Sequence, residues 1–273
     1  MFLNFNYNDA FVGAVRGTIL LLHSVFRGLQ AVYQGAIPPL LGYERLHRFN
    51  SIAYDHEVFY TSEEYNKRGF FDWEREAIDN NLTKGTHFLV LSAGGGREVI
   101  ALLREGFEVD AWECNEKLYT FGNTLLEKEG FSCRISPVAP NMFPPIPPGK
   151  VYDFCIIGWG AYCQIFPREY RVNLLSECRG VVKGPVLISY LPIYERGGKS
   201  KKVWALARRL VRTLPFFFKD VHEDIVIFQL GVYEGISEEK VKQEAEEAGY
   251  DVIMIKTKPY CHAVLVPKAM SCN

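Results

Sequence analysis

The chain has 273 residues, 48% of them hydrophobic and 14% aromatic, which is enough for one large domain or two small ones with a packed core. Its formal net charge of −1 creates no overall field that attracts nucleic acid, so we expect no nucleic-acid partner. The seven cysteines are odd in number, scattered and without a C-x-x-C pair. This pattern indicates reduced thiols in a cytoplasmic protein and argues against disulfides or a zinc site.

A long N-terminal helix is predicted by large apolar residues that recur at three- and four-residue steps over 11–34. Pro38 and Pro39 predict where it ends. Arg16, His23 and Arg27 interrupt its apolar residues, and the run between Arg16 and Arg27 has only ten residues, fewer than the roughly 20 that cross a bilayer. No basic segment precedes it as in a secretory signal. The helix either packs on the domain as a cover or lies on a membrane surface.

Residues 87–115 predict a strand, a glycine turn, a helix and a second strand. Successive glycines at 94–96 let a ligand approach the backbone, and the helix that follows points its unpaired N–H groups toward that ligand. Glu113 ends the second strand, 17 residues past Gly96, where its carboxylate can accept hydrogen bonds from a ribose diol. Val99 occupies the place of the third glycine of the dinucleotide-binding motif, so the match to that motif is incomplete.

These residues resemble the class I S-adenosylmethionine (SAM) dependent methyltransferases of the small-molecule type. That family carries a glycine-rich first motif and an acidic residue that closes the second strand, which Gly94, Gly95, Gly96 and Glu113 match. Ser92 stands where the family usually has its first glycine, and a serine fits there if its φ is negative. The resemblance implies a Rossmann-like, doubly wound α/β fold. Its seven-stranded sheet would be mostly parallel with an antiparallel edge strand.

The resemblance also implies SAM as the cofactor, S-adenosylhomocysteine as the product, and a set of binding residues. A tyrosine-bearing segment before the glycine turn usually covers the methionine end of the cofactor, and an Asp or Asn after the third strand bonds the adenine. The ends of the first and fourth strands flank the site. The candidate cofactor-binding residues are Tyr54, Tyr60, Tyr65, Arg68, Ser92, Ala93, Gly94, Gly95, Gly96, Glu113, Cys114, Asn141, Met142, Gly158 and Trp159.

The remaining elements of such a sheet are predicted in order along the chain. The final helix and strand pair resemble a methyltransferase core that closes with its antiparallel edge strand, whereas a dehydrogenase would continue with parallel units. The predicted helices cover 115–129, 168–179 and 237–248, and the predicted strands cover 131–136, 151–158, 186–191, 224–233, 250–256 and 260–266.

A basic amphipathic helix is predicted over 199–214, within an inserted lid at about 192–236. It either caps the substrate pocket or, with the phenylalanines up to 218, makes a peripheral membrane contact like that considered for 11–34. The domain division that follows is an N-terminal helical extension, 1–50, as a lid or membrane-surface helix, and a methyltransferase domain, 51–273.

The implied reaction moves a methyl group from SAM to a small acceptor, and the two amphipathic helices raise the hypothesis of a lipophilic one. Transfer to oxygen or nitrogen is expected rather than to carbon, and it needs a base. The catalytic candidates are His56, His222 and Tyr162, with His262 as a further histidine and no metal. The alternatives are a Rossmann-type, nucleotide-dependent oxidoreductase and a non-catalytic methyltransferase-like binding protein. The sequence predicts no oligomeric state.

Overall fold

The computed structural model describes residues 7–81, 87–193, 198–215, 218, 221, 224–228, 231–256 and 260–269. Contacts between residues divide the chain into two compact units. The first unit takes Met1–Gly42 and Glu195–Val221, and the second takes Tyr43–Tyr194 and His222–Asn273. The predicted domain boundaries at 1–50 and 192–236 stay predictions beside this division.

Helix α1 (Tyr7–His56) runs through both prolines, so the prediction that it ends at Pro38 and Pro39 was wrong. A proline removes one helical hydrogen bond, but the break in α1 comes at Gly42, whose φ of 71° and ψ of 167° are not helical. The chain changes direction there because glycine adopts a positive φ without steric cost. Gly42 is also the last residue of α1 in the first unit.

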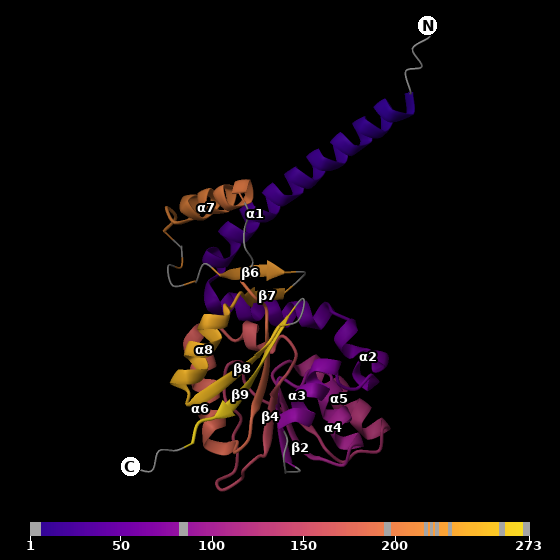
Figure 1. Cartoon of the computed structure of the whole chain (residues 1–273), viewed down its shortest axis with the longest axis vertical. Coiled ribbons are helices and arrows are strands. Elements are labelled where there is room, and N and C mark those ends of the chain that lie inside the picture. The colour runs from indigo at the N-terminus through magenta and orange to yellow at the C-terminus, as the bar shows by residue number, and fades with distance from the viewer. Residues whose placement is uncertain are drawn as a thin grey trace. The chain divides into compact units, whose positions relative to one another are not determined.

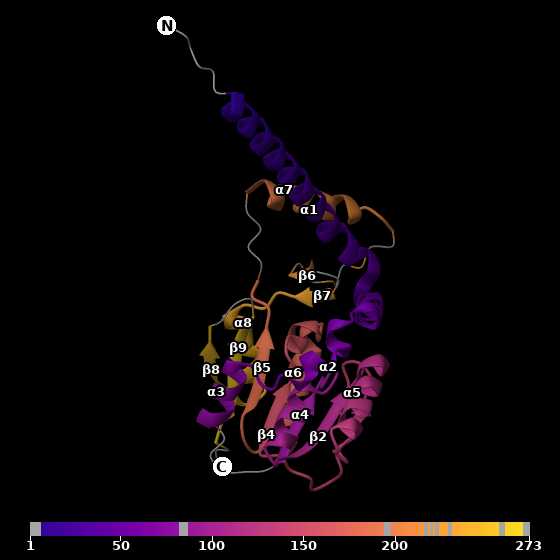
Figure 2. The same ribbon diagram turned by 90° about the vertical axis from the view of Figure 1, so that its right-hand side faces the viewer.

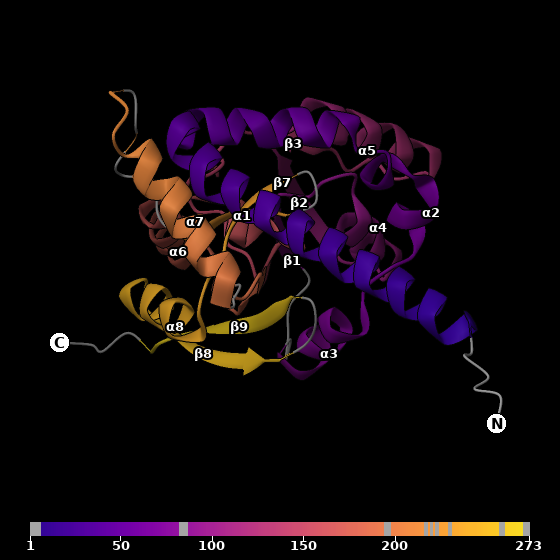
Figure 3. The same cartoon turned by 90° about the horizontal axis from the view of Figure 1, so that it is seen from above.

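The first unit pairs the beginning of α1 with α7 (Gly198–Val211), as seen from above in Figure 3. The two helices approach closely because Gly35 has no side chain: a Cβ there would lie 2.5 Å from the Trp204 carbonyl oxygen. By length and composition, α1 from Phe11 onward is the one helix in the described part of the chain that could cross a membrane. The short apolar run between Arg16 and Arg27 had not predicted a helix of this kind.

The second unit is built on a seven-stranded sheet in the order β3-β2-β1-β4-β5-β9-β8 (Figure 2). The strands from β3 to β5 pair in parallel, and β9 is antiparallel to both β5 and the edge strand β8. This is the predicted fold class. The strands are β1 (His87–Leu91), β2 (Glu108–Glu113), β3 (Ile135–Pro137), β4 (Phe154–Ile157), β5 (Val186–Tyr190), β8 (Tyr250–Ile255) and β9 (Cys261–Pro267).

Helices cover both faces of this sheet (Figure 1). Alternate residues of each strand point to opposite faces, so Phe88 and Val90 join the core under α3, α4 and α5, while Leu89 and Leu91 join the core under α6 and α8. The bounds of the helices are η1 (Phe59–Thr61), α2 (Glu63–Lys67), α3 (Asp72–Asn81), α4 (Arg97–Arg104), α5 (Glu116–Lys128), η2 (Ala161–Gln164), α6 (Arg168–Val181) and α8 (Glu238–Glu247).

The predicted single strand over 224–233 was wrong, because this segment forms the antiparallel pair β6 (Ile225–Phe228) and β7 (Gly231–Glu234). Apolar residues continue through both strands, so the pattern carries no sign of the reversal. Asn50 holds β7 in place: its amide nitrogen donates to the Val232 carbonyl at 2.9 Å, and its amide oxygen accepts from the Val232 N–H at 2.6 Å.

Candidate cofactor site

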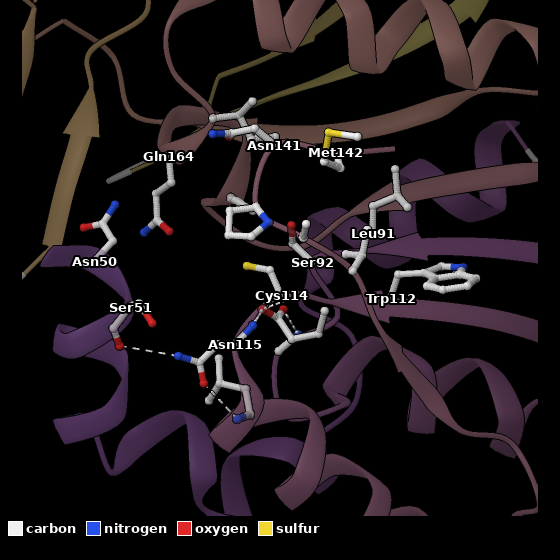
Figure 4. A pocket seen from close by; sticks show the side chains of 18 of the residues that line it. Asn50, Ser51, Leu91, Ser92, Trp112, Cys114, Asn115, Asn141, Met142 and Gln164 are labelled. Carbon is white, nitrogen blue, oxygen red and sulfur yellow. Dashed lines mark hydrogen bonds between the residues drawn. The ribbon is translucent and has the colours of Figure 1, made fainter. Parts of the chain in front are cut away.

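A cavity opens at the carboxyl ends of β1, β2 and β4, in the second unit (Figure 4). Ligands of open α/β sheets bind at this edge, where the order of the strands reverses. In this sheet the reversal lies between β1 and β4. The wall combines the glycine turn after β1, the end of β2, the loop around Asn141, and residues of α1 and η2.

The glycine turn has a more strained backbone than the sequence indicated. Ser92 has a φ of 54°, so the condition that its φ be negative is not met. A residue with a Cβ costs roughly 1–2 kcal/mol in this left-handed region, which is where the family places a glycine. Gly94 also has a positive φ, 56°, and a Cβ built on it would meet nothing within 4 Å. The backbone at Gly94 is therefore open to the cavity.

The three glycines of the turn have different surroundings. Gly95 faces the protein's own chain: a Cβ there would lie 2.4 Å from the Tyr60 carbonyl oxygen and 2.8 Å from the Asn66 side chain. Gly96, with a φ of 96°, is the N-cap of α4. Only Gly94 of the three lines the cavity. Close approach of the segment before β1 therefore accounts for one of the glycines that the motif assigned to the ligand.

Glu113 is held by backbone donors. Its Oε2 accepts from the Gly94 N–H at 2.8 Å, and its Oε1 accepts from the N–H groups of Cys114 and Asn115, each at 2.8 Å. The residue is only 5% exposed. A carboxylate has about four acceptor positions. One position on Oε2 is therefore not taken by a backbone donor, and the turn fixes its orientation.

Asn115 lines the cavity although it was not among the predicted site residues. Its Oδ1 caps α5 by accepting from the Leu118 N–H at 3.0 Å. Its Nδ2 donates to Asp55 Oδ1 at 3.1 Å. It also donates to the Ser51 carbonyl at 3.4 Å (Figure 4). Asn115 thus ties the end of β2 to the last turns of α1. The predicted start of a helix at 115 was the signal that could have identified it.

The loop after β3 brings Asn141 and Met142 to the cavity wall. Asn141 has a φ of 60°, which asparagine tolerates better than most residues, and its Nδ2 lies 3.0 Å from His47 Nε2. His47 was not predicted as a site residue. Its ring stacks on Phe166 at 4.2 Å and its Nε2 lies 2.7 Å from the Phe166 carbonyl oxygen. Burial lowers the pKa of His47, so its imidazole is neutral at pH 7.

Two of the predicted tyrosines line the cavity. Tyr54 and Tyr60 have ring centroids 5.3 Å apart, and the Tyr54 hydroxyl accepts from Gln164 Nε2 at 2.5 Å. Burial raises the pKa of both hydroxyls, so both stay protonated. Tyr65 is buried behind Tyr60, edge to face at 5.6 Å. Arg68 is exposed, with its guanidinium 4.8 Å from the Phe71 ring centroid.

The other predicted cofactor residues divide in the same way. Trp159 and Cys114 line the cavity. Burial and the neighbouring Glu113 carboxylate raise the pKa of the Cys114 thiol, which excludes a thiolate nucleophile. Ala93 is buried in the core on the α4 face. Gly158 lets the end of β4 pass the glycine turn, because a Cβ there would lie 2.1 Å from the Ser92 carbonyl oxygen.

The predicted catalytic residues that the structure describes do not line the cavity. Tyr162 is fully buried and donates to Glu244 Oε2 at 2.6 Å, and burial raises its pKa well above the usual value. His56 is exposed in the last turn of α1. His262 stacks on Trp73 at 3.4 Å, and burial lowers its pKa to about 4. His222 lies outside the described residues.

Two buried arginines form ion pairs with buried glutamates, one on each face of the sheet. Arg97 forms a two-pronged contact with Glu74, 2.6 Å at each prong, and its Nη2 also lies 2.6 Å from Glu98 Oε1. On the other face of the sheet, Arg171 bonds Glu234 at 2.7 Å and Glu244 at 2.7 Å. Among the described residues no group of His, Cys, Asp and Glu could hold a metal ion.

Comparison with known proteins supports the fold. Neither the protein-family models nor the sequences of curated proteins gave a match. Solved structures are similar, among them a Pyrococcus horikoshii OT3 protein with a TM-score of 0.56 at 17% identity, covering 79% of this chain and 98% of that one. A SAM-dependent methyltransferase from Clostridium acetobutylicum ATCC 824 gives a TM-score of 0.53 at 10% identity, over 82% of this chain and 97% of that one.

A third similar structure is the magnesium protoporphyrin IX methyltransferase ChlM from Synechocystis PCC 6803 with bound S-adenosylhomocysteine. Its TM-score is 0.50 at 16% identity, over 82% of this chain and 97% of that one. At these identities the likeness concerns the fold. The strand order, the glycine turn with Glu113 and these structural neighbours together show that the chain has the class I SAM-dependent methyltransferase fold.

Proposed function

We propose that this protein transfers the methyl group of SAM to a small acceptor and releases S-adenosylhomocysteine. The observation that carries the proposal is the pairing of Gly94 with Glu113. An unobstructed glycine backbone and a carboxylate with one acceptor position not taken by backbone donors meet at the edge of the sheet where such folds bind nucleotides. A turn with no ligand would need neither the open face of Gly94 nor the positive φ of Ser92.

The residues of the cavity suit the parts of this cofactor. Glu113 can accept a bond from a ribose hydroxyl, and the Asn141 amide with the exposed Met142 side chain suits the adenine ring. The faces of Tyr54 and Tyr60 suit a sulfonium cation. When bound, SAM supplies a methyl group on a good leaving group, so much of the work left to the protein is alignment and exclusion of water.

The lining favours a neutral acceptor that reacts through oxygen or nitrogen. Gln164, Asn50 and the Tyr54 hydroxyl offer hydrogen bonds without charge, and Glu113 is already engaged by three backbone donors. His47 is neutral and lines the cavity, which makes it a candidate base. The apolar part of the wall, which includes Leu118, Pro140, Pro144, Ile165 and Leu174, supports a lipophilic acceptor.

The test is a transfer assay with SAM that carries an isotopic label on the methyl group. Purified full-length protein is incubated with organic and aqueous fractions of a cell extract, and both labelled product and S-adenosylhomocysteine are measured. The proposal predicts label in a compound of the organic fraction and an equal amount of S-adenosylhomocysteine. Tight SAM binding with no label transferred from either fraction would instead support a non-catalytic binding protein. Binding of NADH in place of SAM would support the oxidoreductase alternative.

A further inference from the structure

The beginning of α1 carries an apolar face that the described parts of its own unit leave uncovered. Phe11, Ile19, Leu22, Phe26 and Leu29 are 71%, 53%, 63%, 66% and 63% exposed. Their spacing places them on one side of the helix. A water-soluble surface seldom leaves such a continuous row of large apolar side chains exposed. Something other than water is therefore expected to cover this face.

A polar stripe runs along the same helix beside this face. Arg16, His23 and Arg27 follow one another at steps of seven and four residues, which places them on one side of the helix. Further along, the side opposite the apolar face packs against α7: Ala31 is 5% exposed, and a Cβ at Gly35 would meet the Trp204 carbonyl. Helix α7 therefore leaves the apolar face uncovered.

The charge of the first unit tells what can cover that face. The sequence of the first unit contains ten Lys or Arg and three Asp or Glu, although the whole chain has a formal net charge of −1. In α7 the exposed cations Lys202 and Arg209 lie beside Leu206 and Leu210, which are 58% and 61% exposed. Apolar side chains next to cations fit the boundary between anionic lipid headgroups and hydrocarbon.

We propose that the first unit binds the surface of an anionic bilayer, with α1 lying along it and its apolar face in the hydrocarbon boundary. A membrane-spanning arrangement would carry Arg16, His23 and Arg27 into hydrocarbon, where charged residues are costly. At the surface these side chains reach the headgroups. A second copy of the chain is a poorer cover, because it would bring an equal set of cations against the first.

The test is flotation of the purified full-length protein with vesicles of phosphatidylcholine, with and without about 30% phosphatidylglycerol. We expect binding to the mixed vesicles, weaker binding without phosphatidylglycerol, and weaker binding as salt rises. The double variant Leu22→Gln/Phe26→Gln should bind the mixed vesicles at least about tenfold more weakly, because two exposed anchors lose their apolar surface. The matched variant His23→Gln/Ser24→Gln places the same residues on the polar side and should bind within about threefold of wild type.

Equal loss of binding in both double variants would overturn the proposal, as would wild-type protein that does not float with the mixed vesicles at low salt. A dimer that dissociates in Leu22→Gln/Phe26→Gln without any vesicle binding would also overturn it and assign the apolar face to a second copy. Vesicle binding does not depend on SAM, so failure here is separate from failure of the proposed methyl transfer.

Discussion

The two units differ in which kinds of side chain they bury and which they expose to water. The second unit buries charge in compensated clusters, such as Arg97 with Glu74 and Glu98, and its apolar strands pack on both faces of the sheet. The first unit does the reverse, since it exposes large apolar side chains such as Phe11 and Phe26. This contrast is the basis of the proposal that the first unit contacts an anionic bilayer.

The largest expected effect comes from breaking the second unit's buried charge cluster. Arg97→Met would leave Glu74 and Glu98 buried without their cation, and should lower the free energy of unfolding by about 3–5 kcal/mol. Urea denaturation measures it. Arg75→Met is the matched control, because the Arg75 side chain is 40% exposed and its loss should cost less than about 1 kcal/mol. Equal losses in the two variants would mean that the cluster is not buried as described.

A second prediction concerns pH. His262 is 3% exposed, and burial lowers its pKa to about 4, while the unfolded chain has the usual value of about 6.5. Between these values the unfolded state binds more protons, so the free energy of unfolding should fall by about 3 kcal/mol as the pH is lowered through this window. Denaturation from pH 7 to pH 4 should show a smaller decline in His262→Gln. Identical declines would contradict the burial of a neutral imidazole.

A smaller effect is expected at the glycine turn. Ser92→Gly should raise the free energy of unfolding by about 1 kcal/mol, because glycine adopts the observed φ of 54° without the clash that serine suffers. The control Ser136→Gly removes a serine from strand β3, where glycine should destabilise. Thermal unfolding of both variants separates them. A less stable Ser92→Gly protein would show that the serine side chain contributes more than its backbone strain costs.

The smallest effect should come from the exposed face of α1. Leu22→Gln/Phe26→Gln should change the free energy of unfolding in water by less than about 0.5 kcal/mol, because both side chains are already more than 60% exposed. Urea denaturation without lipid is the measurement. A loss of several kcal/mol would mean that these side chains are buried in solution, and the contrast between the two units would fail.

Much of the second unit follows from local patterns. Apolar runs bounded by turn residues locate β1, β2, β4 and β5, and Ser237 marks the start of α8, where its Oγ accepts from the Lys240 N–H at 3.2 Å. The order of these elements was enough to predict the sheet. Gly94 and Glu113 are 19 residues apart in the sequence and meet in the structure because both follow strands that end at one edge of the sheet.

What could not be predicted depends on contacts distant in sequence. Position 95 requires a glycine because the Tyr60 carbonyl oxygen lies where a side chain would begin. His47 reaches the cavity because α1 continues past Gly42, and its ring stacks on Phe166. Tyr162 had been expected at the cavity, yet Glu244 holds its hydroxyl in the core. No local pattern in the sequence reports such partners, since each pair is separated by tens of residues.

The most direct test of the cofactor site is calorimetric titration with SAM and S-adenosylhomocysteine of the wild type, Glu113→Gln and the control Glu108→Gln, which alters an exposed residue at the other end of β2. We predict that both ligands bind the wild type and Glu108→Gln alike. Glu113→Gln should weaken binding by about 1.5–3 kcal/mol, the typical contribution of a hydrogen bond to a charged group. Unchanged binding in a folded Glu113→Gln variant, or no binding to the folded wild type, would contradict a cofactor site built on Gly94 and Glu113.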